Sequence, residues 1–280
     1  MAKRAQKSAG GDADNWSFQS INPAEILAGW WQAITVSAGA IIGPALNIAG
    51  IKTPKLKKDE LAQAVRGFPV VGLGMGLAAA LIYAIAHGLN LPPLISAIIA
   101  VSTLALLGGA NSEGGLSRFA DTIITGGTKT AQLARLKDDT FGTYGTIVLI
   151  VALGLRIGAL ATIADTGAVI GALAATMAAS WASVPVLLHY LPPARRSGFA
   201  HLAGRPSRYQ TMLGLALGAA VALWFLGPVT GFIALGVGAL GAFKFAWFAK
   251  RSLGGTTGDV LGAAQQGAEI GMLLAIVARA

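Results

Sequence analysis

The residues of this chain that could do chemistry gather in one polar stretch, residues 108–145, between two apolar runs. It holds four of the twelve acidic residues of the chain: Glu113, Asp121, Asp138 and Asp139. It also holds four basic residues and three Gly-Gly pairs. Carboxylates and glycines gathered between membrane segments indicate a metal–phosphate site at the membrane surface, because Mg²⁺ prefers oxygen ligands.

The spacing of these acids sets what they could do together. Glu113 and Asp121 lie eight residues apart, so on an α-helix they would share a broad face. Magnesium needs only one or two protein carboxylates, since substrate phosphates and water complete its octahedron. The alternative is a solvated loop in which these acids pair with neighbouring basic residues: Arg118, Arg135 and Lys137.

A second glycine-rich turn, Gly-Gly-Thr-Thr-Gly-Asp at residues 254–259, lies just before the last apolar run. Glycines let the backbone approach a phosphate, and the N–H groups at a helix start attract anions. Asp259 could instead cap the helix, and Thr256 and Thr257 are equally typical of a turn. The stretch is not a Walker loop, because it lacks the Lys-Ser/Thr pair.

Other charged residues are weaker indications of a functional site. Arg156 and Glu269 fall within predicted helices, where charge is costly; Arg156 is predicted to face the bundle interior, with a structural salt bridge as the alternative. Four arginines between residues 191 and 209 could grip a phosphate or simply mark a cytoplasmic loop: Arg195, Arg196, Arg205 and Arg208. There is no cysteine and no His-x-x-x-His pair, so thiolate and zinc chemistry are not expected.

The elements that must position these residues are membrane helices. The chain is 54% hydrophobic and 12% charged, with a mean hydropathy of +0.65. A soluble domain has about 25% charged residues. Windows of about 20 apolar residues, without strand-like alternation, predict an all-α, polytopic transmembrane bundle and not an outer-membrane barrel. We attribute the net charge of +9 to basic residues in cytoplasmic loops and not to a surface that binds nucleic acid.

Seven spans are predicted, at roughly 68–89, 94–110, 144–163, 168–190, 210–226, 229–249 and 262–278. The four basic loops then fall on one side of the membrane, and the three short turns fall on the other. By the positive-inside rule these loops are cytoplasmic: 51–67, 111–143, 191–209 and 250–261. The predicted place of the protein is the cytoplasmic (inner) membrane of a bacterium, multi-pass, with its site on the cytoplasmic side.

The N-terminal region divides into a polar, disordered tail at residues 1–22 and an interrupted apolar segment at 24–50. Basic residues lie both before and after that segment. An interfacial or re-entrant placement keeps both basic regions in the cytoplasm and is favoured over a spanning helix. Residues 23–280 are therefore predicted to form one integral membrane domain.

Three motifs carry a resemblance to a known family. Residues 136–145, Leu-Lys-Asp-Asp-Thr-Phe-Gly-Thr-Tyr-Gly, are similar to M-[KR]-D-x-x-[VIL]-G-[TS]-[YH]-G. Residues 254–263 with the downstream Glu269 are similar to G-G-x-T-G-D-x-L-G-A, and the third pattern runs from Leu-Pro-Pro-Ala-Arg at 191–195 to Gly-Arg-Pro-Ser at 204–207. Over about residues 60–275 the chain resembles cobalamin synthase, the adenosylcobinamide-GDP ribazoletransferase family.

The chain departs from that family in its acidic signature, which is close to H-[EL]-D-G-L-A-D-T-x-D-G. Gly114 and Arg118 stand where two of the three aspartates are expected, and only Asp121 remains. Trp181 stands where the family has an arginine. Arg118 brings positive charge to this place, where it could hold a phosphate directly or disable a metal site.

The resemblance implies a phosphotransferase that closes the nucleotide loop of cobalamin. A ribose hydroxyl of α-ribazole, or of its 5′-phosphate, attacks the cobinamide-side phosphorus of adenosylcobinamide-GDP, and GMP leaves. Residues 23–280 would be the transferase domain, with Mg²⁺ as cofactor. The implied catalytic residues are Asp121, Asp138 and Glu113, and the implied metal ligands are Asp121, Asp138 and Asp259. The implied phosphate and substrate contacts are Arg118, Gly254, Gly255, Thr257, Gly258 and Asp259.

Two other functions are weighed against this transferase. A catalytically impaired family member would bind a corrinoid, a nucleotide or a partner without turnover, and the departures at Gly114, Arg118 and Trp181 favour it. A transporter is opposed by the confinement of most charge to the loops. The lipid bilayer is an expected partner and nucleic acid is not. A homo-oligomer and contacts with other corrinoid-assembly enzymes are left open.

Overall fold

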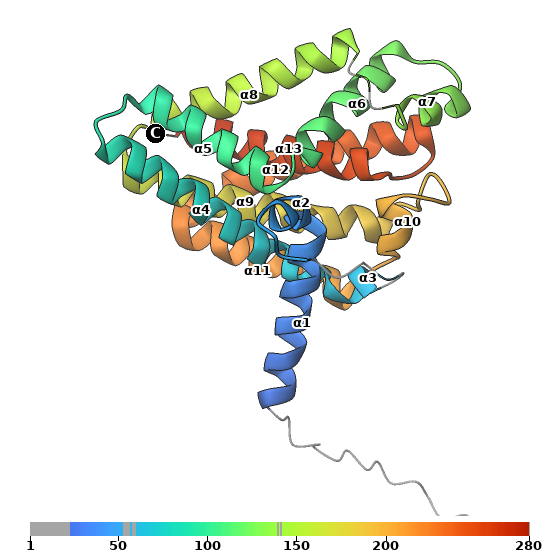
Figure 1. Cartoon of the computed structure of the whole chain (residues 1–280), viewed down its shortest axis with the longest axis horizontal. Helices are drawn as coiled ribbons and strands as arrows, with labels where there is room; N and C mark the ends of the chain where they lie inside the picture. The colour runs from blue at the N-terminus through green and yellow to red at the C-terminus, as the bar shows by residue number, and fades with distance from the viewer. Residues whose placement is uncertain (1–22, 53–56, 58–59, 139, 141, 280) are drawn as a thin grey trace, which may run out of the picture.

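The computed structural model of the chain describes residues 23–52, 57, 60–138, 140 and 142–279. The predicted tail at residues 1–22, and Asp139, lie outside these residues. The described part is a bundle of long helices from which α1 projects (Figure 1). The only β-pairing among the described residues is an isolated bridge between Pro193 and Thr256.

Seven long helices make up the body of the bundle. Their bounds are α4 Phe68–Gly88, α5 Pro93–Leu107, α8 Thr143–Ile163, α9 Thr166–Tyr190, α11 Arg208–Leu226, α12 Pro228–Leu253 and α13 Gly258–Val277. The remaining helices are α1 Pro23–Ile41, α2 Gly43–Ile48, α3 Glu60–Ala64, α6 Asn111–Thr125, α7 Lys129–Arg135 and α10 Phe199–Ala203, with a 3₁₀ turn at Val65–Gly67.

The helices are long and apolar enough for a multi-pass membrane protein. Six helical segments are each long and apolar enough to cross a membrane alone, and the first, Glu60–Gly88, runs from α3 through α4. Helices α5 and α6 make a seventh if this pair counts as one span. The pair is bent by 88°. The predicted all-α polytopic bundle of about seven spans is therefore confirmed for the described residues.

Helices α9 and α13 form the centre of the bundle. In their apolar windows 78% and 67% of residues are buried, against 22% in α8, α11 and α12. Many side chains on α9 are small, so its neighbours approach closely. A Cβ at Gly76 of α4 would overlap the α9 backbone at Leu173, and one at Gly241 of α12 would overlap Gly267 of α13. The outer helices are left to face lipid.

Helix α1 runs across the long axes of the bundle helices, and its first residues extend away from the body (Figure 1). The helix is tied from Gly29 onwards to the chain before α4. The Ser37 hydroxyl donates to the Ala64 carbonyl at 2.9 Å, and the Arg66 guanidinium donates to the Gly29 carbonyl at 2.9 Å and lies over the Trp30 ring. An orientation across the spans is the one expected of an interfacial segment. That placement stays a prediction.

Within the predicted loop 111–143 the structure has two helices, α6 and α7. Helix α6 has few large apolar residues, which is why its composition indicated a connection between spans and not a span. Apart from Leu116 and Phe119, its buried residues are small or polar: Ser112, Glu113, Gly114, Gly115, Ser117, Ala120 and Thr122. It packs between α8 and α13, so tertiary contacts stabilise a helix that its own apolar content does not.

The basic connections gather at one end of the bundle. In Figure 1, α3, α7, α10 and the turn between α12 and α13 all lie at the right, and the turns α4–α5 and α11–α12 lie at the left. This is the grouping that the charge pattern predicted. It places the motif residues of distant segments at the same end of the molecule.

Candidate functional site

An ion pair between α6 and α13 lies at the centre of the candidate site. The Nε and Nη2 atoms of Arg118 both donate to Oδ1 of Asp259 at 2.8 Å. The Asp259 side chain is 7% exposed and that of Arg118 is 23% exposed. The two helices meet closely, because a Cβ on Gly115 would come within 2.9 Å of the Asp259 carbonyl oxygen.

Two cavities meet at this ion pair. One of about 250 Å³ is lined by Trp181, Gly258 and other residues, and one of about 370 Å³ is lined by Lys137 and its neighbours. Three residues line both cavities: Arg118, Arg195 and Asp259. We call the two cavities together the cationic cleft, because its lining holds three cationic side chains and one carboxylate.

Arg195 has spare hydrogen-bonding capacity in this cleft. Its Nη1 atom is buried without a hydrogen-bond partner, and so is the indole Nε1 of Trp181. Buried donors in native proteins are usually paired, so two unpaired donors that line one cavity indicate a ligand rich in acceptors. Guanidinium groups are well suited to phosphate oxygens.

The start of α13 adds to the attraction for an anion. Thr257 is its N-cap: the Thr257 hydroxyl accepts the Val260 N–H at 3.4 Å. The same hydroxyl donates to Oδ2 of Asp259 at 3.5 Å. Gly258, the first residue of α13, lines the 250 Å³ cavity. The positive end of the helix dipole therefore faces the cleft.

Gly254 and Gly255 shape the turn, and neither lines the cationic cleft. Gly254 ends α12 with a φ of +73°, in the left-handed region that favours glycine. At Gly255 a Cβ would overlap the Pro192 carbonyl, so this position also needs glycine. Thr256 pairs with residues 192–194: its N–H donates to Pro192 O, and its carbonyl accepts the Ala194 N–H, both at 2.8 Å. Direct phosphate contact by the two glycines stays a prediction.

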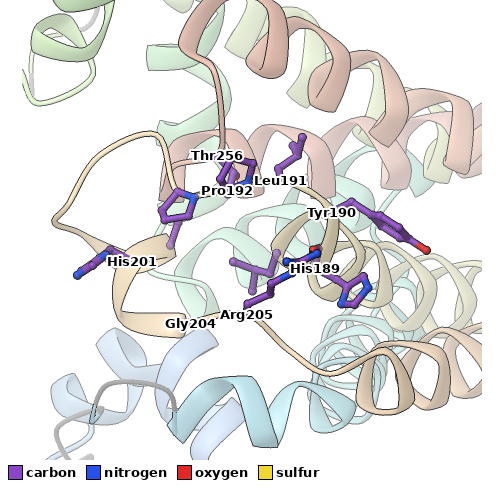
Figure 2. Close-up of a pocket in the computed structure, with 11 residues that line it drawn as sticks. His189, Tyr190, Leu191, Pro192, His201, Gly204, Arg205 and Thr256 are labelled. Atoms are coloured by element: carbon purple, nitrogen blue, oxygen red, sulfur yellow. The ribbon is translucent and has the colours of Figure 1, made fainter.

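The segment from α9 to α11 holds Arg195 in place and encloses a third cavity of about 340 Å³ beneath the Pro192–Thr256 pairing. Figure 2 shows Arg205 reaching towards His189, while His201 points the other way. The Arg205 Nε donates to the His189 carbonyl at 2.9 Å. His189 Nδ1 lies 2.8 Å from the Pro206 carbonyl and must therefore carry a proton.

Asp121 and Asp138 lie outside the lining of the cationic cleft. Asp121 is half-buried at the start of α8, where its Oδ1 accepts the Gly145 N–H at 3.4 Å. A Cβ on Gly142 would overlap this carboxylate. Asp138 is exposed, and its Oδ1 accepts the Thr140 N–H at 3.3 Å.

The described residues do not build a metal site by themselves. No three of their His, Asp and Glu side chains are grouped so that they could hold an ion. Asp121, Asp138 and Asp259 are thus not gathered around one point, and Arg118 already occupies Oδ1 of Asp259. The donor set fits only a magnesium ion held mainly by substrate phosphates, with one or two carboxylates added.

Glu113 belongs to a buried charge network in the bundle interior. Arg156 of α8 donates from Nη1 to Glu113 of α6 and from Nε to Glu269 of α13, both at 2.9 Å. Gln266 donates to Glu113 at 3.1 Å, and Gln265 donates to Glu269 at 3.1 Å. Arg156 is 1% exposed, which confirms the prediction that it faces the interior. The network ties α6, α8 and α13 together.

Glu113 and Asp121 share the face of α6 that meets α8, as their spacing predicted. They lie about 12 Å apart along the helix axis. They therefore serve different places: the buried network and the start of α8. A joint action on one ion is not what this geometry supports.

Comparison with known proteins decides the family. The family model described as cobalamin-5-phosphate synthase matches residues 45–277. The chain belongs to this cobalamin-5-phosphate synthase family. The resemblance seen in the sequence motifs is thereby confirmed.

The chain is similar over most of its length to curated members named adenosylcobinamide-GDP ribazoletransferase. It is 40% identical to the one from Bradyrhizobium diazoefficiens, over 78% of this chain and 84% of that one. It is 39% identical to one from a Sinorhizobium species, over 78% and 86%, and 35% identical to one from Azorhizobium caulinodans, over 82% and 89%. No solved structure matches the chain.

Within this member of the family, the two departures in the acidic signature are structurally linked. A Cβ on Gly114 would lie 3.2 Å from Nη1 of Arg118. The missing side chain at Gly114 leaves room for the Arg118 guanidinium, so the two positions act as a pair. Sequence spacing does not reveal this, nor that Arg195, Lys137 and Trp181 meet Arg118 at one cleft. Arg195 was named among four candidate arginines and ends the motif at 191–195, but the sequence did not place it beside Arg118.

Proposed function

We propose that this protein is an adenosylcobinamide-GDP ribazoletransferase. It would join the cobinamide phosphate of adenosylcobinamide-GDP to α-ribazole or to its 5′-phosphate. Membership of the cobalamin-5-phosphate synthase family carries this proposal. The relatives with that name, at 35–40% identity, add to it. A cleft lined by Arg118, Lys137 and Arg195 suits the diphosphate of such a substrate.

The residues of the chain would act by position and charge. The three cations bind and orient the diphosphate, and the start of α13 adds the partial charge of its N–H groups. A ribose hydroxyl oxygen forms the new bond to the cobinamide-side phosphorus. The bond from that phosphorus to the oxygen of GMP breaks, and GMP leaves with the electron pair. A carboxylate takes the hydroxyl proton.

The carboxylates differ in how well they suit that role. Asp259 lines both cavities, so it is the acid nearest to the proposed diphosphate. Asp121 and Asp138 stay proposed acid–base residues or metal ligands. Neither is in an ion pair among the described residues, so both can accept a cation. Glu113 is held by Arg156 and Gln266, which favours a positioning role over proton transfer.

Magnesium is proposed as the cofactor of turnover. It would be held by the substrate diphosphate and by Asp121, Asp138 or Asp259. When bound, it would neutralise charge on the phosphates and on the leaving GMP.

We propose that the protein lies in the cytoplasmic membrane of a bacterium with the cationic cleft facing the cytoplasm. The basic connections share one end of the bundle (Figure 1), and Lys137 and Arg195 of the cleft lie in two of these connections. Basic residues usually mark cytoplasmic loops. The bilayer would surround the exposed apolar faces of α8, α11 and α12. Self-association and contacts with other corrinoid-assembly enzymes are further proposals.

The test is a transfer assay with purified protein in detergent or nanodiscs. Adenosylcobinamide-GDP, α-ribazole and Mg²⁺ should yield a cobalamin and GMP, separated by chromatography. Asp259→Asn should lower the rate by about a hundredfold or more, the range of acid–base contributions. Glu25→Gln, in exposed α1, is the control and should leave the rate unchanged. A wild-type protein that binds substrate but forms no GMP would contradict the proposal.

A further inference from the structure

The Arg118–Asp259 pair lies where the two cavities of the cationic cleft meet. The substrate of the proposed function has a matching shape: a diphosphate in the middle and a bulky organic group at each end. If the diphosphate lies at the ion pair, guanosine can enter one cavity and the cobinamide arm can enter the other. Two cavities that share Arg118, Arg195 and Asp259 in their lining suit such a molecule.

The charges where the two cavities meet favour an anion, with no metal counted. Arg118, Lys137 and Arg195 provide three positive charges, and Asp259 provides one negative charge. Arg195 makes no ion pair within the described part of the chain, and its Nη1 is buried and unpaired. An arriving phosphate oxygen would satisfy that donor.

The carboxylates, by contrast, are not arranged to bring a metal to this place. Asp259 is the acid in the lining of the cleft, and Arg118 already neutralises it. A doubly donated carboxylate attracts a cation less strongly than a free one, because the guanidinium repels it. Asp121 and Asp138 are held elsewhere.

We propose that Arg118, Arg195 and Lys137 bind the diphosphate directly, so that binding of the nucleotide end, unlike turnover, needs no metal ion. The guanosine enters the 250 Å³ cavity beside Trp181. Arg118 shares its donors between Asp259 and the phosphate in the bound state. This inference rests on the proposed function for the identity of the ligand and concerns only how the ligand is held.

The test is calorimetric titration of the purified full chain with GDP, once with Mg²⁺ and once with excess EDTA. We expect dissociation constants within about threefold of each other in the two conditions. Arg195→Gln should weaken GDP binding about ten- to a hundredfold, the range of a lost hydrogen bond to a charged group. The matched control is Arg196→Gln, the exposed neighbour that lines neither cavity, and it should bind like wild type.

A second pair of titrations places the two ends of the ligand. Trp181→Leu should weaken GDP and leave inorganic pyrophosphate unchanged, because pyrophosphate has no base to contact the indole. Arg118→Gln should weaken both probes. Arg195→Gln carries the test if Arg118→Gln fails to fold, because Arg195 has no ion-pair partner to lose in the described structure.

Three results would overturn the inference. These are loss of GDP binding in EDTA, equal affinities of Arg195→Gln and Arg196→Gln, and no GDP binding by wild type in either condition. Transfer activity is measured separately on the same samples. An active protein whose GDP binding vanishes in EDTA keeps its function and refutes the metal-free site. An inactive protein that binds GDP in EDTA keeps the metal-free site and refutes the proposed function.

Discussion

Two ion-pair regions join α6 to α13, and they differ in how completely their donors are used. In the buried charge network, Arg156 is enclosed and shared between Glu113 and Glu269, with two glutamines filling further acceptors. In the cationic cleft, Arg118 is partly exposed, and Arg195 beside it has an unpaired donor. A saturated cluster suits the holding of helices in place. An unsaturated one suits the binding of something else.

The largest expected effect is on stability at the buried network. Arg156→Met leaves two carboxylates buried without their cation, which costs about 3–5 kcal/mol. Thermal unfolding in detergent measures the loss. Lys244→Met on exposed α12 is the control and should change little. If Arg156→Met unfolds like wild type, the contrast between the two regions fails.

A smaller loss of stability is expected for Arg118→Met in the cleft. Asp259 would lose two charged hydrogen bonds but keep Thr257 and the start of α13, so the cost is about 1–2 kcal/mol. GDP binding should fall far more than stability does. A loss of stability as large as that of Arg156→Met would show that the pair is structural first.

Removing the cap of α13 tests whether the cleft depends on that helix start. Thr257→Ala removes the hydroxyl that accepts the Val260 N–H, at a cost of about 1 kcal/mol. Thr257→Ser keeps the hydroxyl and serves as the matched control. The unfolding temperatures of the two variants should differ by the contacts of this hydroxyl, with Val260 N–H and with Oδ2 of Asp259. Equal values would contradict the assignment of Thr257 as N-cap.

The smallest effect is expected at Gly114. Gly114→Ala places a methyl group about 3.2 Å from Nη1 of Arg118, so the guanidinium must shift by a few tenths of an ångström. Helix propensity alone favours alanine by up to about 1 kcal/mol, which offsets the crowding in stability. GDP affinity should nevertheless fall, by about threefold. The same change in an Arg118→Gln background should have no further effect on binding, which isolates the pairing of the two positions.

The spans were largely predictable from sequence because a long apolar run by itself indicates a helix that crosses the membrane. The predicted helix at 144–163 is found at Thr143–Ile163, and the one at 168–190 is found at Thr166–Tyr190. Helix α6 lies in the stretch assigned from its charge to a cytoplasmic loop, and the burial of its many small and polar residues comes mainly from α8 and α13. Local composition does not contain that information.

The site was predictable in its residues and not in its arrangement. The motifs identified Asp259, Arg118 and Asp121 as functional candidates, yet gave no sign that Arg118 bonds Asp259 while Asp121 faces the start of α8. Such contacts join segments more than a hundred residues apart in the case of Arg118 and Asp259. They depend on helix packing angles, which spacing along the chain does not fix.

The buried network also joins the two helices, α6 and α13, that carry the ion pair of the cleft. Glu113 precedes Arg118 on α6 by about 8 Å along the axis, and Glu269 follows Asp259 on α13 by about 15 Å. Arg118 and Asp259 thus lie at unequal distances along their helices from the residues that Arg156 binds. A small rotation of α6 or α13 about Arg156 would move Arg118 or Asp259 by a larger distance. A substitution that never contacts the nucleotide could therefore change the width of the cationic cleft.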